Sequence, residues 1–257
     1  MRAIWSGSIG FGLVNIPIKL YTAINSSTLD LDMLDKKDHA NIKFQRVNEN
    51  TGREVPWKSI VRAYNLDGKY VVLDDKDFEQ AMPEKTKLVE ITAFADATEI
   101  DSMLFEAPYY IEPEKNGQRA YSLLHDALVK TGKVGVGSFV LRNKEQLCVI
   151  KATGKLLVLQ KIHFEEEIKD TGDLNIPSGH PKPAELKMAI SLIDQLSGPF
   201  DISGYKDTYS GKLMKLIKAK ATGKKTTAPH LKVVHSKARD LMSQLKASLE
   251  TKKRKAS

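Results

Sequence analysis

The 257 residues of this chain carry a formal net charge of +8 and suffice for one large domain, or for one domain with an appendage. A single cysteine, Cys148, excludes an intramolecular disulfide and any metal site built from several cysteines. No stretch approaches the roughly 18 apolar residues of a membrane span, and the N-terminus lacks the apolar core of a signal peptide, so we expect a cytoplasmic protein without a membrane segment.

The first half of the chain is expected to consist of strands around one long loop. Residue types and turn signals predict strands over residues 12–23, 69–74, 87–94 and 108–112. Pro17 in the first strand predicts an edge position or a bulge, because proline cannot donate a hydrogen bond to a β ladder. Residues 28–68 hold seven basic residues among few apolar ones, and predict a protruding hairpin or a long functional loop.

The second half contains the clearest pattern, a meander of three strands. Turns at residues 142–144 and 152–155 separate strands over residues 134–141, 146–151 and 156–164. Cys148 is expected to be buried in the second of these strands. Many short strands with few intervening helices are typical of an antiparallel barrel or sandwich, and we favour the barrel.

Two helices are expected beside these strands. Tyr121, Leu124 and Leu128 share one face of a segment that ends at Gly132, a residue type common just after a helix. A later segment stops at Gly198-Pro199 and has an apolar stripe of Leu186, Ala189, Ile190, Ile193 and Leu196. We expect both helices to pack on the sheet, which makes the fold class mixed and mainly β.

The chain changes character after Asp207. Residues 211–257 hold 14 of the 40 basic and 2 of the 32 acidic residues, a balance of +12, whereas the 26 basic and 30 acidic residues before them balance at −4. A cationic arm on a slightly acidic body is typical of polyanion binding, and a solvated, disordered tail is the alternative. We therefore expect a core over residues 1–210 and a basic region over residues 211–257.

The basic region itself predicts two helices. Four lysines beside a short apolar stripe indicate a basic amphipathic helix over residues 212–220, and a linker over residues 222–229 follows. The second helix is expected from residue 231 to 249 and either folds back on the core or binds a partner. Its apolar stripe consists of Val234, Ala238, Leu241, Leu245 and Leu249.

Motifs for catalysis and for cofactor binding are weak. The opening glycines start like a dinucleotide-binding loop, but Asn15 stands where that fingerprint needs glycine, and residues 132–138 do not match P-loop spacing. The six histidines have no short metal-ligand spacing. The acidic clusters at residues 74–77 and 165–167 are typical of solvated turns. The sequence therefore predicts no cofactor, no metal site and a protein that is not an enzyme, with a hydrolase as the alternative.

Several blocks of sequence together resemble one known family. Residues 1–21 read MRAIWSGSIGFGLVNIPIKLY, and matching blocks follow in the family's order at residues 52–56 (GREVP), 67–73 (DGKYVVL), 131–142, 185–201 and 240–249 (DLMSQLKASL). These blocks span nearly the whole chain and closely resemble bacterial Ku, the DNA-end-binding protein of non-homologous end joining.

The resemblance implies a homodimer whose barrels and long bridging hairpins close a ring that threads onto the end of double-stranded DNA. Residues 28–68 would form the bridge hairpin. In the family, the C-terminal region recruits and stimulates an ATP-dependent end-joining DNA ligase, and its distal lysines add DNA binding, which implies a nucleoid-associated protein. DNA contacts are expected from Lys43, Arg46, Arg53, Lys58, Arg62, Arg142, Lys144, Lys252, Lys253, Arg254 and Lys255. Ligase contacts are expected from Leu241, Met242, Leu245 and Leu249.

The chain departs from the family at the bridge tip. Many relatives carry cysteines there, whereas this chain reads QRVNENT at residues 45–51, so no tip metal is implied. Two other functions remain open beside the end-binding scaffold. One is a basic protein that coats duplex DNA through its tail alone. The other is an enzyme that acts on damaged ends through a lysine Schiff base.

Overall fold

The computed structural model describes residues 1–25, 28–81 and 87–223. The chain divides into two compact units, one of residues 1–26 and 30–170 and the other of residues 27–29 and 171–257. Within the described residues, no helix is long and apolar enough to cross a membrane.

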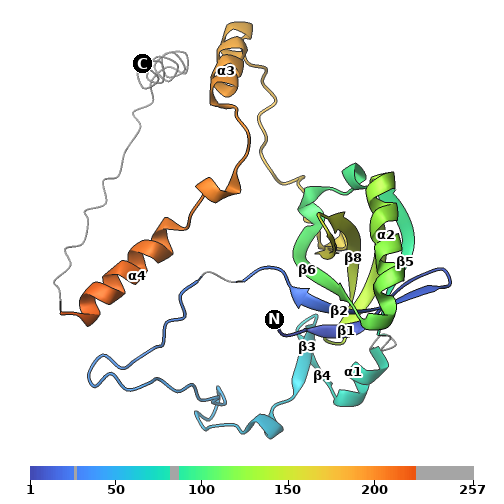
Figure 1. The fold of residues 1–257 in the computed structure, drawn as a ribbon. Helices are drawn as coiled ribbons and strands as arrows, with labels where there is room; N and C mark the ends of the chain where they lie inside the picture. Colours follow the sequence, from blue (N-terminus) through green and yellow to red (C-terminus); the bar gives the residue numbers. More distant parts are fainter. Residues whose placement is uncertain (26–27, 82–86, 224–257) are drawn as a thin grey trace. The chain divides into compact units, whose positions relative to one another are not determined.

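Seven strands of the first unit form a closed barrel (Figure 1). They are β1 (Trp5–Phe11), β2 (Val14–Thr22), β5 (Leu88–Asp96), β6 (Phe105–Pro113), β7 (Lys133–Leu141), β8 (Lys144–Thr153) and β9 (Leu156–Ile162). Around the barrel their order is β1-β2-β6-β9-β8-β7-β5, and every neighbouring pair is antiparallel except β1 with β5. The expected mainly antiparallel barrel is therefore confirmed.

β1 is a strand that the sequence did not predict, because its two glycines, Gly7 and Gly10, resemble a loop. Gly7 is needed for packing: a Cβ there would lie 2.3 Å from both the Trp5 ring and the Lys87 carbonyl oxygen. The Trp5 ring packs edge-on against Phe139 at 6.1 Å, and its Nε1 donates to the Val140 carbonyl at 3.1 Å. The glycine thus leaves room for the Trp5 ring of β1 to reach Phe139 and Val140 of β7, across the intervening strand β5.

The prediction that Pro17 marks an edge position or a bulge is wrong, because neither ladder of β2 has a register shift. β2 pairs with β1 on one side and with β6 on the other. The β2–β6 ladder begins only at Ile18, and the Pro17 carbonyl accepts a hydrogen bond from the Glu114 amide at 2.9 Å. The nitrogen and the carbonyl of one extended residue face the same side of a strand. The Pro17 nitrogen therefore lies just before the first residue pair of the β2–β6 ladder, Ile18 with Pro113. No residue of the ladder needs a hydrogen-bond donor from Pro17 there.

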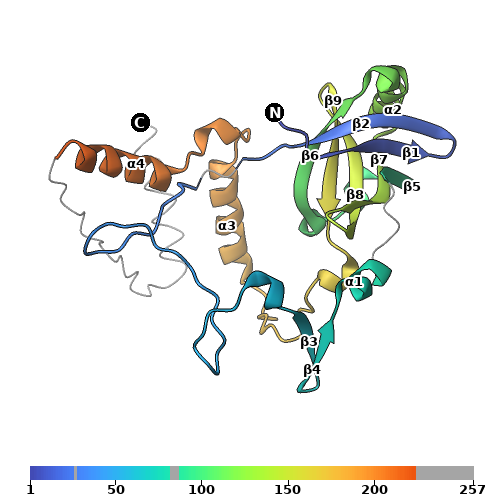
Figure 2. The ribbon, with the colours of Figure 1, turned by 90° about the horizontal axis from the view of Figure 1, so that it is seen from below.

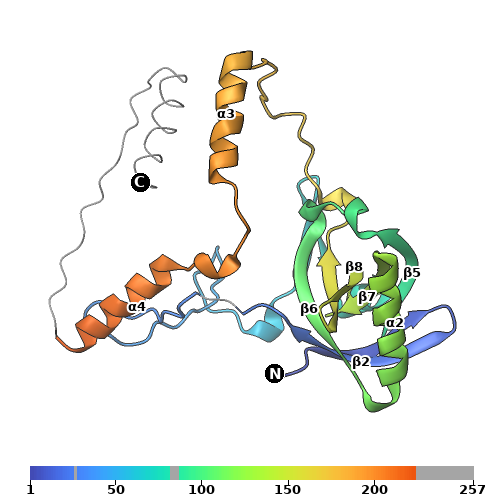
Figure 3. The same cartoon turned by 45° about the horizontal axis from the view of Figure 1, so that its top comes forward.

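The core fills the barrel interior and continues under α2 (Gln118–Thr131), which closes one end of the barrel (Figures 1 and 3). Tyr121, Leu124 and Leu128 are buried there as predicted, and Gly132 caps the helix with a φ of 67°. The Tyr121 hydroxyl donates to the Ile111 carbonyl at 3.1 Å and accepts from the Leu157 amide at 2.7 Å. The interior residues are Ile9, Ile16, Ile18, Leu20, Val89, Ile91, Ile111, Phe139, Cys148, Ile150, Leu157 and Leu159.

Gly137 in β7 is a second close backbone approach. A Cβ at this position would lie 1.9 Å from the Glu90 carbonyl oxygen of the paired strand β5. We expect Gly137→Ala to destabilise the barrel by about 2–3 kcal/mol, because two backbones would have to move apart. Chemical denaturation would measure the change. Gly179→Ala is the matched control, since a Cβ there meets nothing within 4 Å, and an equal loss in both variants would contradict this reason.

His125 joins α2 to the turn between β8 and β9. Its Nδ1 lies 3.0 Å from the Asp126 carboxylate and its Nε2 lies 3.0 Å from the Gly154 carbonyl. The Asp126 hydrogen bond, followed by that of Gly154, raises the pKa of His125 above its usual 6.5. Only the protonated ring donates to both acceptors at once.

The stabilisation from His125 should therefore be complete below pH 6.5 and disappear as the pH rises through the raised pKa. Thermal unfolding followed from about pH 5 to pH 9 should show a fall in Tm that His125→Gln reduces. His180→Gln, a change at an exposed histidine, should leave the profile as it is. A profile unchanged by His125→Gln would contradict the assignment.

Cys148 is buried in β8 as expected, and burial raises the pKa of its thiol to about 12. A smaller cluster on the outer wall contains Val134, Val149 and Ile162, and residues of the β5–β6 connection pack against it. The described 3-10 turns are η1 (Trp57–Ser59), η2 (Ala97–Glu99), η3 (Ser102–Leu104), η4 (Lys115–Gly117), η5 (Glu165–Glu167) and η6 (Ile202–Gly204).

A two-stranded hairpin lies outside the barrel sheet, followed by a short helix (Figure 2). β3 (Arg62–Leu66) pairs with β4 (Lys69–Leu73), and α1 (Asp75–Ala81) follows. The strand predicted near residue 69 is thus confirmed, but it pairs with the end of the long loop and not with the barrel. No residue of either strand is buried.

The two acidic clusters considered for catalysis lie at element starts. The Asp74 carboxylate accepts from the Asp77 amide at 3.0 Å and the Asp77 carboxylate from the Asp74 amide at 2.8 Å, which caps α1. Glu167 accepts from the Phe164 amide at 2.9 Å and lies 3.1 Å from His163 Nδ1, and these bonds lower the pKa of its carboxyl. Both clusters are capping groups.

The second unit contains α3 (Pro183–Leu196) and α4 (Thr208–Ala221), as the sequence predicted. The expectation that α3 packs on the sheet stays a prediction, because α3 belongs to the second unit and the barrel to the first. Within the described residues, none of the residues of α3 is buried. Asp207 caps α4 by accepting from the amides of Tyr209 and Ser210, and the bond to Ser210 lowers the pKa of this carboxyl. The helix predicted over residues 231–249 lies outside the described residues.

Candidate nucleic-acid interface

The long loop concentrates its positive charge in one part. Residues 28–68 hold seven basic and seven acidic residues, a balance of zero. Residues 42–62, which we call the cationic bridge segment, hold five basic residues and two acidic ones, a balance of +3. The basic residues of this segment are the predicted DNA contacts Lys43, Arg46, Arg53, Lys58 and Arg62. All five residues are exposed, so a polyanion can reach their side chains.

The cationic bridge segment contains a small hairpin with its own hydrogen bonds. Val47 bridges to Glu54, and the Asn48 side chain accepts from the amides of Asn50 and Thr51 at 3.0 Å each. Gly52 completes the loop with a φ of 66°, a conformation that glycine adopts without steric cost. Arg46 and Arg53 therefore flank one ordered tip, on opposite strands.

The structure distinguishes the bridge cations by their contacts. The Arg46 guanidinium lies over the Trp57 ring at 4.4 Å from its centroid. Arg62 lies over the Phe78 ring at 3.6 Å and forms an ion pair with Asp75 at 3.4 Å, so it links β3 to α1. Within the described residues, no ion pair holds the side chains of Lys43, Arg53 or Lys58. These three cations can bind a phosphate without first breaking an ion pair.

Arg142 and Lys144 lie at the turn between β7 and β8. Arg142 and Asn143 both have positive φ, 52° and 68°, which is the geometry of a tight type I′ hairpin turn. Both basic residues line a hollow of about 440 Å³ at one end of the barrel. This hollow, which we call the barrel mouth, is lined by Ile4, Thr22, Glu106, Tyr109, Leu141, Arg142, Lys144, Gln146 and Lys161. Lys161 is a cation of this site that the sequence did not predict.

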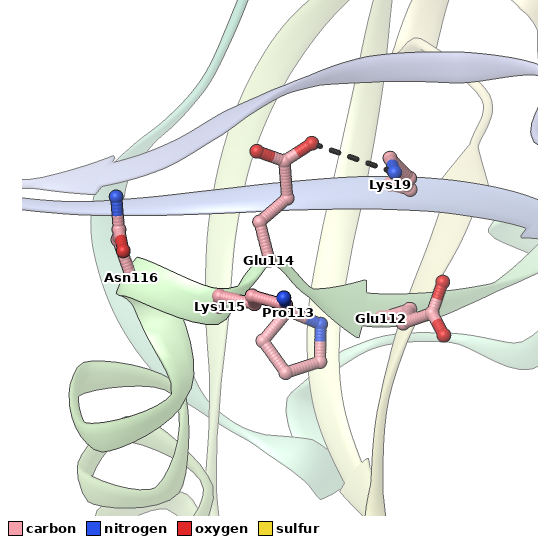
Figure 4. A pocket seen from close by; sticks show the side chains of 6 residues that line it. All are labelled: Lys19, Glu112, Pro113, Glu114, Lys115 and Asn116. Carbon is pink, nitrogen blue, oxygen red and sulfur yellow. Dashed lines mark ion pairs between the residues drawn. The ribbon is translucent and has the colours of Figure 1, made fainter.

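A second hollow of about 520 Å³ lies beside the start of α2 (Figure 4). Its lining contains two lysines and two glutamates, so its charges balance. Lys19 Nζ lies 3.7 Å from Glu114, and Glu112 accepts a hydrogen bond from the Tyr21 hydroxyl, which raises the pKa of Tyr21. This hollow offers no excess charge to a polyanion, unlike the barrel mouth.

α4 presents further cations, which were not among the expected DNA contacts. Residues 208–221 contain four lysines and no acidic residue. All four lysines are exposed: Lys212, Lys215, Lys218 and Lys220. The remaining predicted contacts lie outside the described residues, namely Leu241, Met242, Leu245, Leu249, Lys252, Lys253, Arg254 and Lys255. No group of three or more metal-ligating side chains is assembled in the described part of the chain.

Comparison with known proteins identifies the family. Residues 10–188 match the family model described as the Ku70/Ku80 beta-barrel domain, which is more than half of the chain. The chain belongs to the Ku family. The matched residues of this Ku chain include the cationic bridge segment, the barrel from β2 onwards, α2 and the start of α3.

Bacterial relatives extend the match over most of the chain. The non-homologous end joining protein Ku of Opitutus terrae is 42% identical over 231 residues, 88% of this chain and 83% of its own length. The proteins of the same name from Anaeromyxobacter sp. and Bacillus subtilis are 39% and 37% identical, and each alignment covers 99% of this chain. A solved structure, the SPOC domain of human PHD-finger protein 3, covers 63% of this chain with a TM-score of 0.30 and 11% identity, a likeness too low to support an argument.

Proposed function

We propose that this Ku chain forms a homodimeric ring that binds the ends of double-stranded DNA without sequence preference and acts in non-homologous end joining. The observation that carries the proposal is the cationic bridge segment within a chain of the Ku family. Relatives that cover almost the whole chain carry the name of an end-joining protein. The role proposed is that of a scaffold without a catalytic centre, bound to DNA in the cytoplasm.

Sequence-independent binding is supported by the kind of charge that the segment carries. Lysines and arginines spread over an exposed loop suit phosphates, which are alike at every base pair. Base readout needs a helix or a ribbon whose side chains reach base edges in a groove. A ring needs no such contacts to select ends, because only an end can be threaded through it.

Homodimer formation is supported by apolar faces that the single chain leaves uncovered. The β3–β4 hairpin is exposed on both faces, with Tyr64 and Tyr70 at 65% and 71% exposure. An isolated two-stranded hairpin is only marginally stable in water. α3 likewise exposes Ile193 and Leu196 at about 60% each. A second copy of the chain that covers these faces would bury them and stabilise both elements.

We also assign ligase recruitment to the apolar residues Leu241, Met242, Leu245 and Leu249, on the strength of the family resemblance of residues 240–249. Replacing Leu241 and Leu245 by aspartate should abolish stimulation of an ATP-dependent end-joining ligase, because a carboxylate is costly to bury in an apolar contact with a partner. Duplex-end binding by the same variant should remain. Loss of both activities would indicate a fault in the fold, and retention of both would contradict the assignment.

The ring mechanism is tested by comparing a linear duplex with a covalently closed circle of the same sequence. At near-physiological salt, where nonspecific binding is weak, the linear form alone should bind, and bulky blocks at both ends should abolish that binding. Equal binding to both forms would contradict the ring and favour a protein that coats duplex DNA. Borohydride trapping on an abasic end would reveal a lysine Schiff base instead.

A further inference from the structure

The two ends of the barrel differ in the side chains that fill them. α2 closes one end with apolar residues, whereas at the barrel mouth the interior rows finish with polar ones. Side chains at alternate positions of a strand point to one face. Lys161 therefore continues the interior row of Leu157 and Leu159, and Gln146 continues that of Cys148 and Ile150. The barrel mouth is thus a polar end to an otherwise apolar interior.

The barrel mouth has an apolar floor and a cationic rim. Tyr109 and Leu141 pack against the main core and form the floor. Arg142, Lys144 and Lys161 face one acidic residue, Glu106, so three positive charges meet one negative charge. The mouth therefore has an excess of two positive charges, although residues 1–210 as a whole balance at −4.

Glu106 partly neutralises this excess by holding Lys161. The Lys161 Nζ lies 2.6 Å from Glu106 Oε2, and these side chains are only 22% and 38% exposed. A lysine ammonium has three donors, and one carboxylate oxygen does not satisfy all of them. An anion that entered the hollow would compete with Glu106 for Lys161 and would also meet Arg142 and Lys144 at the rim.

We propose that the barrel mouth binds one phosphate group, held by Lys161, Arg142 and Lys144, with Glu106 as the competing carboxylate. A phosphate monoester or inorganic phosphate fits this site, because each carries up to two negative charges and at least three acceptor oxygens in a compact group. A phosphate within a duplex backbone has fewer free oxygens and a chain on both sides. Two sources are therefore open, free phosphate and the terminal phosphate of a DNA end, and only the second rests on the proposed function.

Titration of the full-length protein with inorganic phosphate alone tests the site. Amide signals of Thr22, Gln146 and Lys161 in ¹H–¹⁵N spectra should shift and saturate together, which separates the mouth from the lysine-rich tail. Glu106→Gln should bind phosphate roughly 10-fold more tightly, because Lys161 loses its competing partner. Lys161→Gln should bind it roughly 10-fold more weakly, because a charge-assisted hydrogen bond is lost.

Glu114→Gln is the matched control for Glu106→Gln. It removes one carboxylate from a lysine–glutamate pair in the charge-balanced hollow (Figure 4), with the same change in net charge. It should leave phosphate affinity at the mouth unchanged. Shifts confined to the tail, shifts that do not saturate, or equal gains from Glu106→Gln and Glu114→Gln would overturn the proposal.

Linear duplexes with 5′-phosphate and 5′-hydroxyl ends separate the two sources. A preference of the Glu106→Gln protein for 5′-phosphate ends, with no such change in Glu114→Gln, would assign the site to DNA ends. Equal binding to both duplexes, with the inorganic phosphate shift intact, would assign it to free phosphate. The comparison of linear and circular DNA remains the separate test of end binding, so either idea can fail without the other.

Discussion

A variant with Lys43, Arg46 and Arg53 replaced by alanine is expected to bind duplex ends on the order of 10- to 100-fold more weakly at moderate salt. These residues belong to the cationic bridge segment, which carries a balance of +3 within a long loop whose overall balance is zero. If each contacts one phosphate, the slope of log affinity against log salt should become shallower by about 2.7. Fluorescence anisotropy at several salt concentrations would measure both quantities.

The control for this variant replaces three exposed lysines elsewhere on the chain, Lys130, Lys155 and Lys169. It lowers the net charge by the same amount. It should change the slope of log affinity against log salt little if the DNA phosphates contact the cationic bridge segment. The cationic bridge segment contains no buried residue, so thermal stability of the barrel should be alike in both variants. An unchanged salt slope in the bridge variant would refute the assignment of these contacts.

Replacing Ile190 and Ile193 of α3 by glutamate is expected to convert the proposed homodimer into monomers. The two side chains are 49% and 61% exposed in the single chain, on the stripe that also carries Leu186 and Leu196. If a second copy covers this stripe, two unpaired carboxylates would be buried there, and the dissociation constant should rise by more than about 100-fold. Sedimentation equilibrium would measure the change, and end binding should fall with it because a half ring cannot enclose DNA.

Lys187 and Ser191 lie on the polar side of the same helix and provide the matched control. Both are exposed, and replacing both by glutamate adds acidic groups to α3 without touching the apolar stripe. The control protein should remain dimeric. Dissociation of both variants to the same extent would point to weakened helix α3 or to general charge repulsion, and would contradict an interface at the stripe.

The sequence predicted correctly those elements whose position depends on neighbouring residues alone. The meander of β7, β8 and β9 and the end of α2 at Gly132 follow from alternation, turn residues and a left-handed cap, which are properties of neighbouring residues. β1 was missed because Gly7 and Gly10 serve packing against Trp5 and Leu88, contacts that no local pattern reveals. Pro17 was misassigned because the edge rule ignores where the ladder with the next strand begins.

The sequence by itself determined the charge layout, the cationic bridge segment and the family, because each is carried by residue identity and order along the chain. Only the tertiary structure decided which charges meet. Pairing of β6 with β9 brings Glu106 to 2.6 Å from Lys161, and both line the same hollow as Arg142. Pairing of β3 with β4 brings Arg62 to Asp75 and Phe78. These contacts depend on strand register, since a shift of one residue would turn Lys161 out of the barrel. The contacts show that the barrel mouth keeps an excess of positive charge, whereas Arg62 is already paired with Asp75.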